Sequence, residues 1–289
     1  MESFESNETK ETNENVNFQS RINLDPLKTS VDKIRHELGK VIVGQHKMID
    51  QLIVSILANG HILLEGVPGV AKTLTAKLLS KSMALDFSRI QFTPDLMPSD
   101  IIGTSVFDLS KSSFEFKKGP IFSNFILIDE INRAPAKTQA ALFEVMEERQ
   151  ITVDGKTYIM DEPFLVIATQ NPIEQEGTYR LPEAQLDRFL FKISIGYPNL
   201  SEEITILQKE NELQNRNKMA DVATIVSKSE IKEFQGLLKQ IIIEPNLIEY
   251  IAKVVLNTRE NPFLYLGASP RASIAILNAS KGFAAIKGR

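Results

Sequence analysis

The sequence predicts an α/β core built on a parallel sheet with helices on both faces, followed by a smaller all-helical domain. Short runs made almost entirely of apolar residues alternate with helical patterns as far as Pro198. Strands that are buried on both faces read as continuous apolar runs, and their alternation with helices is typical of parallel sheets. After Pro198 only helical patterns remain. We therefore expect a domain boundary near this proline.

The composition is that of an ordinary soluble globular protein. The 289 residues are 43% hydrophobic and 24% charged, which is enough for a sizeable core. The net charge of −4 gives no general attraction to nucleic acid or to anionic membranes. Cysteine is absent, which excludes disulfides, thiolate catalysis and cysteine-based metal sites. No apolar run is long enough for a membrane span or a secretory signal, so we expect a cytoplasmic protein without membrane insertion.

The core is predicted to span residues 25–197, after a tail at 1–24 that is rich in Asn, Glu and Ser and is expected to be disordered. Two helices come first, at "PLKTSVDKIRHELGK" and "HKMIDQLIVSILAN", and the strand "HILLEG" follows them. A glycine-containing loop leads from this strand into the helix "KTLTAKLLSKSMA". The remaining predicted elements of the core are the strand "FILIDEIN", the helix "KTQAALFEVMEER" and the strands "FLVIATQNP" and "FLFKISIGYP".

Two segments interrupt this alternation. Residues 104–120 alternate apolar and polar side chains around a Ser-rich turn, and residues 150–160 place Asp154 and Gly155 between β-prone arms. Both patterns predict hairpins added to the core. The helical domain is predicted at 198–289, with helices at "SEEITILQKEN", "SKSEIKEFQGLLKQI", "NLIEYIAKVVLNTREN" and "SPRASIAILNASKGFAAIKG".

The loop after the first strand, "GVPGVAKT", differs by one residue from the phosphate-binding pattern G-x-x-x-x-G-K-[ST]. Gly66 and Gly69 would allow a tight path whose N–H groups bind an anion, assisted by the positive end of the following helix. Lys72 would reach the β- and γ-phosphates, and the Thr73 hydroxyl would bind Mg²⁺. The alternative is a plain β-turn at Val-Pro-Gly.

The departure from the pattern is Ala71, which stands where the pattern has glycine. We expect this residue at the start of the helix, with right-handed helical angles that alanine adopts readily.

Two acids end the next buried strand. The run from Phe125 to Ile128 delivers Asp129 and Glu130 at its carboxyl end, where ligands bind in open α/β sheets. Asp129 would hold Mg²⁺, and Glu130 would polarise the attacking water. Two adjacent carboxylates with no cation nearby would repel each other, and a bound metal with a phosphate would remove this repulsion. The alternative is a pair of acids that merely face solvent.

Three further side chains fit phosphoryl transfer. Asn171, at the end of the strand "FLVIATQNP", could hydrogen-bond both the water and the γ-phosphate, although asparagine after a strand is often only a turn residue. Arg188 follows a short helix, and Arg271 begins a helix of the second domain. An arginine directed at the γ-phosphate contributes about 10³- to 10⁵-fold in rate. The alternative for each arginine is a surface or ion-pairing role.

This ordered set of motifs resembles the MoxR group of AAA+ ATPases, within the clade that carries helix-2 and pre-sensor-1 inserts. The resemblance covers residues 25–289 and rests on "VIVGQ", "GVPGVAKT", "FILIDEINRAPAKTQAALFEVMEERQITVDG", "ATQNP", "LPEAQLDRF" and "GASPR". It implies an AAA+ P-loop core with a helical lid. Alanine before the loop lysine is tolerated in this group. The lid of the group continues beyond the sensor-2 helix, whereas this chain stops at "FAAIKGR", so we expect either a shortened lid or a sequence that is incomplete at this end.

The resemblance implies specific site residues. Lys72 and Thr73 would form Walker A, and Asp129 and Glu130 Walker B. Asn171 would be sensor 1. The residues implied to contact ATP are Val43, Gly44, Gly66, Pro68, Gly69, Val70, Ala71, Lys72, Thr73 and Leu74, with Mg²⁺ on Thr73 and Asp129.

The resemblance also implies roles for three arginines. Arg271 would be sensor 2, reaching the phosphates from the lid. Arg188 would be the arginine finger on the nucleotide of a neighbouring subunit, and Arg133 is a further candidate for that interface.

The resemblance further implies a homo-oligomeric ring, expected to be a hexamer, because Arg188 has no phosphate to meet in its own subunit. Chaperone-like maturation or remodelling of protein substrates is expected, with a partner that bears a von Willebrand factor A domain. The hairpins would line or gate a central pore. Three alternatives stay open: a nucleic-acid motor using Lys111, Lys117, Lys118 and Lys156, a metal-chelatase subunit, and a nucleotide-bound scaffold without turnover. Mixed charge in the hairpins makes nucleic acid an unlikely ligand.

Overall fold

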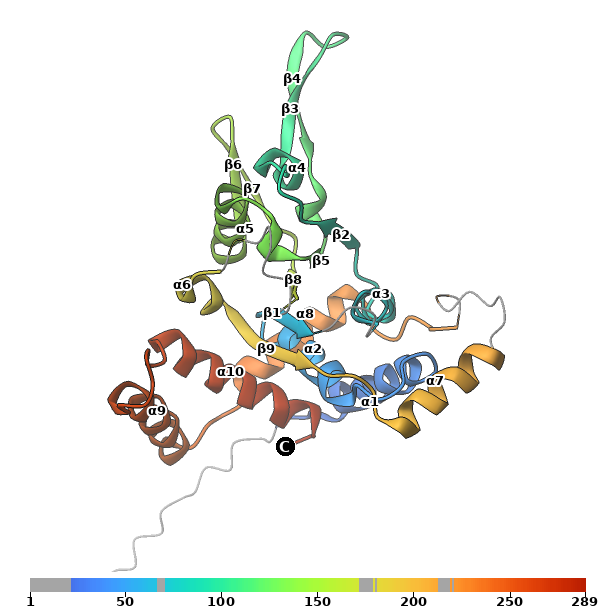
Figure 1. Cartoon of the computed structure of the whole chain (residues 1–289), viewed down its shortest axis with the longest axis vertical. Coiled ribbons are helices and arrows are strands. Elements are labelled where there is room, and N and C mark those ends of the chain that lie inside the picture. The colour runs from blue at the N-terminus through green and yellow to red at the C-terminus, as the bar shows by residue number, and fades with distance from the viewer. Residues whose placement is uncertain (1–21, 67–70, 172–178, 180, 213–218, 220) are drawn as a thin grey trace, which may run out of the picture.

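The computed structural model describes residues 22–66, 71–171, 179, 181–212, 219 and 221–289. Its centre is a five-stranded parallel sheet in the order β2-β5-β8-β1-β9 (Figure 1). The strands are β1 (His61–Gly66), β2 (Phe87–Gln91), β5 (Phe125–Asp129), β8 (Leu165–Gln170) and β9 (Phe189–Ile195). The predicted parallel sheet is thus confirmed, and β2 is an additional strand at its edge.

Strand β2 could not be predicted from the sequence, because only one of its five side chains, Ile90, is buried. As an edge strand it pairs only with β5 and carries polar residues such as Arg89 and Gln91. The long apolar run that marks the central strands is therefore absent.

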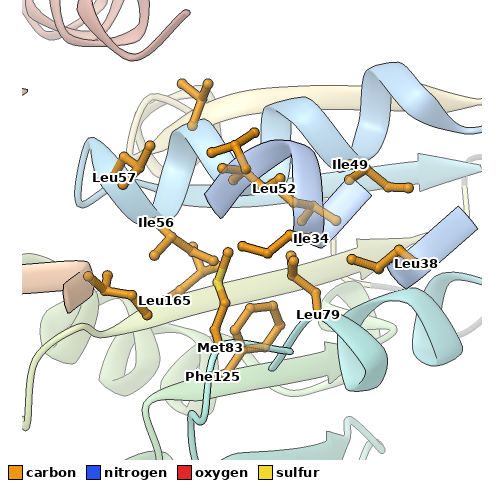
Figure 2. Packing of buried hydrophobic residues seen from close by; sticks show 14 of the residues in the cluster. Ile34, Leu38, Ile49, Leu52, Ile56, Leu57, Leu79, Met83, Phe125 and Leu165 are labelled. Atoms are coloured by element: carbon orange, nitrogen blue, oxygen red, sulfur yellow. The ribbon is translucent and has the colours of Figure 1, made fainter. Parts of the chain in front are cut away.

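Helices cover both faces of the sheet. Buried side chains of α1 (Asp25–Gly39), α2 (His46–Leu57) and α3 (Lys72–Ser82) form one core cluster with Phe125, Leu127 and Leu165 (Figure 2). The other face packs Ile126 and Ile128 against α5 (Ala136–Glu148). Alternate residues of β5 thus enter opposite clusters, as the period of two in a strand requires.

Both predicted hairpins are present, and they lie together on one side of the sheet (Figure 1). The short helix α4 (Pro98–Ile102) leads into β3 (Gly103–Asp108), which pairs antiparallel with β4 (Ser113–Lys118). Strands β6 (Gln150–Val153) and β7 (Lys156–Ile159) form the second hairpin directly after α5.

Aromatic packing joins the two hairpins. The ring of Phe116 lies 4.7 Å from that of Tyr158, and Phe122, in the 3₁₀ turn η1 (Pro120–Phe122), lies 6.0 Å from Phe116. Ser105 also donates a hydrogen bond to Asp154. A displacement of one hairpin would therefore be transmitted to the other.

The C-terminal part is helical in its described residues. It contains α7 (Leu200–Glu212), α8 (Lys228–Gln240), α9 (Pro245–Glu260) and α10 (Pro270–Ile286), and the single turn α6 (Glu183–Leu186) precedes β9. Residues of α8 and the end of α10 belong to the same core cluster as α1 and α2. None of the helices described is long and apolar enough to cross a membrane.

The position of α10 is fixed by close packing. Gly282 lies against Val54 of α2, where an added Cβ would come within 2.6 Å of a methyl group. The ring of Phe283 lies 6.0 Å from that of Phe191 on β9. These contacts fix the orientation of α10, and with it the end of the sheet at which the first residues of α10 lie.

His61, fully buried at the start of β1, should make folding sensitive to acid. Its Nδ1 accepts from the Val166 N–H at 3.0 Å, so Nε2 carries the proton and donates to the Met146 carbonyl at 3.1 Å. Burial, reinforced by the charge of Arg149, lowers the pKa of His61 to about 4. The unfolded chain therefore binds a proton first as the pH falls, and the free energy of unfolding should decrease by about 3 kcal/mol between pH 6.5 and pH 4.

Denaturant unfolding across this pH range tests this expectation. His61→Gln keeps an acceptor and a donor without a titrating ring, and it should remove that part of the pH slope. Exposed His36→Gln is the control for loss of a histidine. Equal slopes for the wild type and His61→Gln would contradict the expectation.

Candidate active site

The predicted phosphate, acid and amide residues meet at one end of the sheet. Gly66 ends β1, Asp129 ends β5, and Asn171 comes directly after β8. Because β8 lies between β5 and β1, Asn171 lies between the other two strand ends. Parallel strands thus bring together residues that are far apart in sequence, at the edge where α/β sheets bind ligands.

The loop that leaves β1 is described at its two ends, and Pro68, Gly69 and Val70 lie outside the described residues. Gly66 is needed because an added Cβ would lie 2.6 Å from the carbonyl oxygen of Ile195 on β9. Close packing against β9 therefore explains this glycine independently of any ligand.

Ala71 is left-handed, with φ 55° and ψ 22°, and it precedes the first residue of α3. The right-handed angles expected for it are wrong. Glycine, which the usual pattern has at this position, adopts this left-handed conformation without strain. A left-handed L-residue costs roughly 1–2 kcal/mol.

Ala71→Gly should accordingly leave the free energy of unfolding unchanged or raise it by up to about 1.5 kcal/mol. The substitution relieves the left-handed strain, and a gain of about 0.4–1 kcal/mol in unfolded-state entropy offsets part of the benefit. Ala140→Gly is the matched control, because Ala140 is exposed within α5. There glycine should cost about 0.5–1 kcal/mol. Equal losses for both variants, measured by urea denaturation, would show that Ala71 is not strained.

Lys72 is directed across the loop toward the strand ends. Its Nζ donates to the Gly66 carbonyl at 2.7 Å. Burial lowers the pKa of Lys72, while the charges of Asp129 and Glu130 act in the opposite direction. The ammonium group therefore lies within electrostatic reach of both acids, which is the placement that a phosphate contact requires.

The two acids have cationic partners in their own chain. Asp129, which is buried, accepts from Arg89 Nε at 2.6 Å, and Thr169 donates to its other oxygen at 3.3 Å. Glu130 accepts from Gln91 Nε2 at 2.8 Å and lies 3.1 Å from the Nε of Arg133. Arginine side chains of the same chain thus also relieve the repulsion between the two acids, a source of charge compensation that was not predicted.

Arg89 and Gln91 are site residues that sequence reasoning missed. Both belong to β2. Because the strand carries polar side chains, it lacks the apolar run that would mark it in the sequence. The same polar side chains bind the two acids. Arg133, in the 3₁₀ turn η2 (Ile131–Arg133), contacts Glu130 within its own chain, so interaction with a neighbouring subunit would require it to turn away.

The donor set fits Mg²⁺ held jointly with a phosphate. The Thr73 hydroxyl comes from the first turn of α3, and the carboxylate of Asp129 comes from the end of β5. Among the described residues no group of three His, Cys, Asp or Glu could hold a metal by itself. Mg²⁺ is commonly bound through one or two carboxylates with substrate phosphates and water, and this site offers that combination.

A pocket of about 670 Å³ extends from the start of α3 toward α7. Its wall includes Val43 before α2, Ala71 and Leu74 at the start of α3, Ile195 at the end of β9, and Ile206 of α7. The volume suits a nucleotide-sized ligand, and the apolar residues suit a purine ring. Gly44 lies beside this wall with φ 69°, and an added Cβ there would meet Glu202 of α7 at 2.4 Å.

Arg188 lies at the opposite end of the sheet. It precedes Phe189, which pairs with His61 at the start of β1. Gly66 lies five residues further along β1 than His61, a distance of about 17 Å at 3.3 Å per residue. The guanidinium donates to the Phe143 carbonyl at 2.6 Å and lies 6.0 Å from the Phe143 ring centre. Arg188 is thus remote from the pocket of its own chain.

Arg271 lies at this remote end too. Its Nη2 is 2.5 Å from Glu147 at the end of α5, next to Met146, whose carbonyl binds His61. Ser269, two residues earlier, donates to Asp187 at 2.7 Å. An arginine reaching its own phosphates from the lid is therefore not what the structure shows. Packing of α10 along α2 and β9 carries Arg271 to the other end of the sheet.

Two family descriptions match the chain. "ATPase family associated with various cellular activities (AAA)" matches residues 61–191, from β1 into β9. "AAA lid domain" matches residues 256–289, which contain the end of α9 and all of α10.

Several proteins are similar over most of the chain. Chaperone MoxR1 of Mycobacterium tuberculosis is 44% identical over 269 residues, 90% of this chain and 70% of that protein. YeaC of Bacillus subtilis is 44% identical over 257 residues, 89% and 79% of the two chains. A crystal structure of a candidate ATPase from Cytophaga hutchinsonii is 46% identical, with a TM-score of 0.85, and the match covers 92% of this chain and 82% of that one. The chain therefore belongs to the MoxR group of AAA+ ATPases.

Proposed function

We propose that the protein hydrolyses ATP with Mg²⁺ in a head-to-tail ring, with Arg188 and Arg271 of one subunit completing the pocket of the next. The observation that carries this proposal is the separation of the two halves of the site. Lys72, Asp129 and Glu130 lie at one end of the sheet, and the two arginines lie at the other. Repeating such a contact around a closed rotation generates a ring, and the resemblance favours a hexamer.

Each side chain at the pocket then has a chemical task. Val43 and Gly44 would hold the adenine, and the loop with Lys72 would hold the β- and γ-phosphates. Mg²⁺, bound through Thr73 and Asp129, would supply charge neutralisation on the phosphate oxygens. Glu130 would take the proton of the attacking water, and Asn171 would orient that water. The arginines of the neighbour would stabilise the charge that develops on the γ-oxygens.

Arg89 and Arg133 would balance the charge of the two acids. Their guanidinium groups neutralise Asp129 and Glu130 through contacts of 2.6 and 3.1 Å. Once these acids engage the metal and the water, the guanidinium groups would have to move aside.

The test is the ATPase rate per subunit, at saturating ATP and Mg²⁺, as protein concentration rises. A rate that climbs with concentration and then levels off is expected, because an isolated subunit lacks the arginines of a neighbour. Arg188→Ala should keep its affinity for ATP but stay slow at every concentration. A low rate that depends neither on concentration nor on Arg188 would instead favour a scaffold without turnover.

We further propose that hydrolysis drives the maturation or remodelling of protein substrates, with a partner bearing a von Willebrand factor A domain. The joined hairpins support this, since they project from the body with Phe114 and Leu109 exposed (Figure 1). Affinity capture with Glu130→Gln in ATP tests the idea. Recovery of neither a protein substrate nor such a partner would count against it.

The hairpins favour protein over nucleic acid. Lys111 lies 3.3 Å from Glu115 and 3.6 Å from Asp108, and Lys118 lies 5.0 Å from the Phe122 ring centre. These local partners reduce the positive charge available to a phosphate backbone. DNA binding that weakens with salt and disappears on replacing Lys117 and Lys118 would restore the nucleic-acid reading.

A further inference from the structure

Glu147 brings two distant arginines together. It is near the end of α5, and each of its carboxylate oxygens faces a different guanidinium. Oε1 lies 2.5 Å from Nη2 of Arg271 at the start of α10. Oε2 lies 3.9 Å from Nη1 of Arg188, just before β9. Three separate segments thus converge on one carboxylate.

Stability alone does not account for this arrangement. The side chains of Glu147, Arg188 and Arg271 are 38%, 29% and 47% exposed. Ion pairs between side chains this exposed contribute little to folding stability. Two adjacent guanidinium groups would also repel each other without an anion between them. The main effect of the Glu147 carboxylate is therefore to fix the positions of the two guanidinium groups.

One side of the Arg188 guanidinium is held by the protein, and the other side is available to bind an anion. Its Nη1 donates to the Phe143 carbonyl, whereas its Nη2 has no hydrogen-bond partner among the described residues. Fixing part of a guanidinium preorganises its remaining donors. Arg188 thus retains donors for a further anion beside the carboxylate of Glu147.

We infer that Glu147 is a positioning residue that holds Arg188 and Arg271 as a pair, ready for the γ-phosphate of a neighbouring subunit. Carboxylate and phosphate oxygens accept from arginine in the same charge-assisted geometry. Because both arginines contact one carboxylate, both can also bind one phosphoryl group. This inference rests on the proposed function, because it requires the two arginines to act across a subunit interface.

The test is a double-mutant cycle on the full chain, with the ATPase rate measured at a concentration that saturates assembly. Glu147→Gln should lower kcat about 10- to 100-fold, the loss expected when a charged hydrogen-bond partner is removed. It should leave the Tm and the affinity for ATP unchanged. Glu148→Gln, the exposed next residue on α5, is the matched control and should keep the wild-type kcat. Glu147→Asp retains the charge and should recover part of the rate.

The decisive readout is non-additivity. In an Arg188→Ala, Arg271→Ala background, Glu147→Gln should cause no further loss, because it acts only through these two side chains. A full additional loss in that background, or a wild-type kcat for Glu147→Gln alone, would overturn the inference. If Arg188→Ala and Arg271→Ala themselves left the rate unchanged, the proposed function would fail instead, so the two failures are distinguishable.

Discussion

Replacing Glu130 with glutamine is expected to lower the rate of ATP hydrolysis about 10²- to 10⁴-fold, the usual contribution of a general base. Glutamine has the shape of glutamate and can still bond with Gln91, but it cannot take a proton from water. The binding contacts made by the loop and by Lys72 are untouched. The affinity for ATP should therefore stay within a few fold of the wild-type value. Single-turnover hydrolysis and equilibrium ATP titration measure the two quantities separately.

The control for this experiment is Glu144→Gln, on the exposed face of α5. It removes the same charge at a position away from the strand ends and should hydrolyse ATP at the wild-type rate. Wild-type turnover by Glu130→Gln would remove Glu130 from the chemistry. A parallel loss of ATP affinity would show that its role is in binding.

The central sheet and the strand-end acids could be predicted because their signals are local. Strand β5 is buried at all five positions and ends in Asp129, so its apolar run identifies both the strand and the site at its end. The hairpin at Asp154 and Gly155 was also predictable, since both residues have positive φ and the turn fixes the pairing of its arms.

Other features depend on contacts between distant segments. The partners of Asp129 and Glu130 come from β2, whose position at the sheet edge follows from its pairing with β5. The left-handed conformation of Ala71 could not be predicted from residue types, since alanine seldom adopts it. A sequence motif was enough to predict each acid, but the cations beside them could be identified only from the tertiary structure.

Arg271 illustrates the same limit at longer range. By resemblance, the motif "GASPR" predicts an arginine that binds a nucleotide phosphate. The motif does not indicate whether that nucleotide belongs to the same subunit or to a neighbour. The position of Arg271 depends instead on how α10 packs on the core, through the contacts of Gly282 with Val54 and of Phe283 with Phe191. Figure 1 shows the result, with α9 and the start of α10 on one side of the molecule and α7 on the other. The predicted site residues consequently lie at two different edges of the subunit.

Arg188→Ala is expected to reduce hydrolysis about 10³- to 10⁵-fold, the contribution of an arginine finger. The variant retains Lys72, Asp129 and Glu130, so it should still bind ATP. Arg188 also bonds the Phe143 carbonyl, so a matched Tm is needed to show that the loss is not a folding defect. Arg188→Lys keeps the charge but not the forked donors, and it should recover only part of the rate.

Mixing two inactive variants would show on which subunit Arg188 acts. An Arg188→Ala subunit has an intact pocket but supplies no arginine, while a Glu130→Gln subunit has a disabled pocket but supplies Arg188. If the arginine acts across the interface, an equal mixture should regain about a quarter of the wild-type rate, since one pocket in four pairs an intact Glu130 with a neighbour's Arg188. If it acts within its own chain, no mixed site is complete and the mixture stays inactive. Arg271→Ala mixed with Glu130→Gln should behave in the same way, because Glu147 holds both arginines at the same edge.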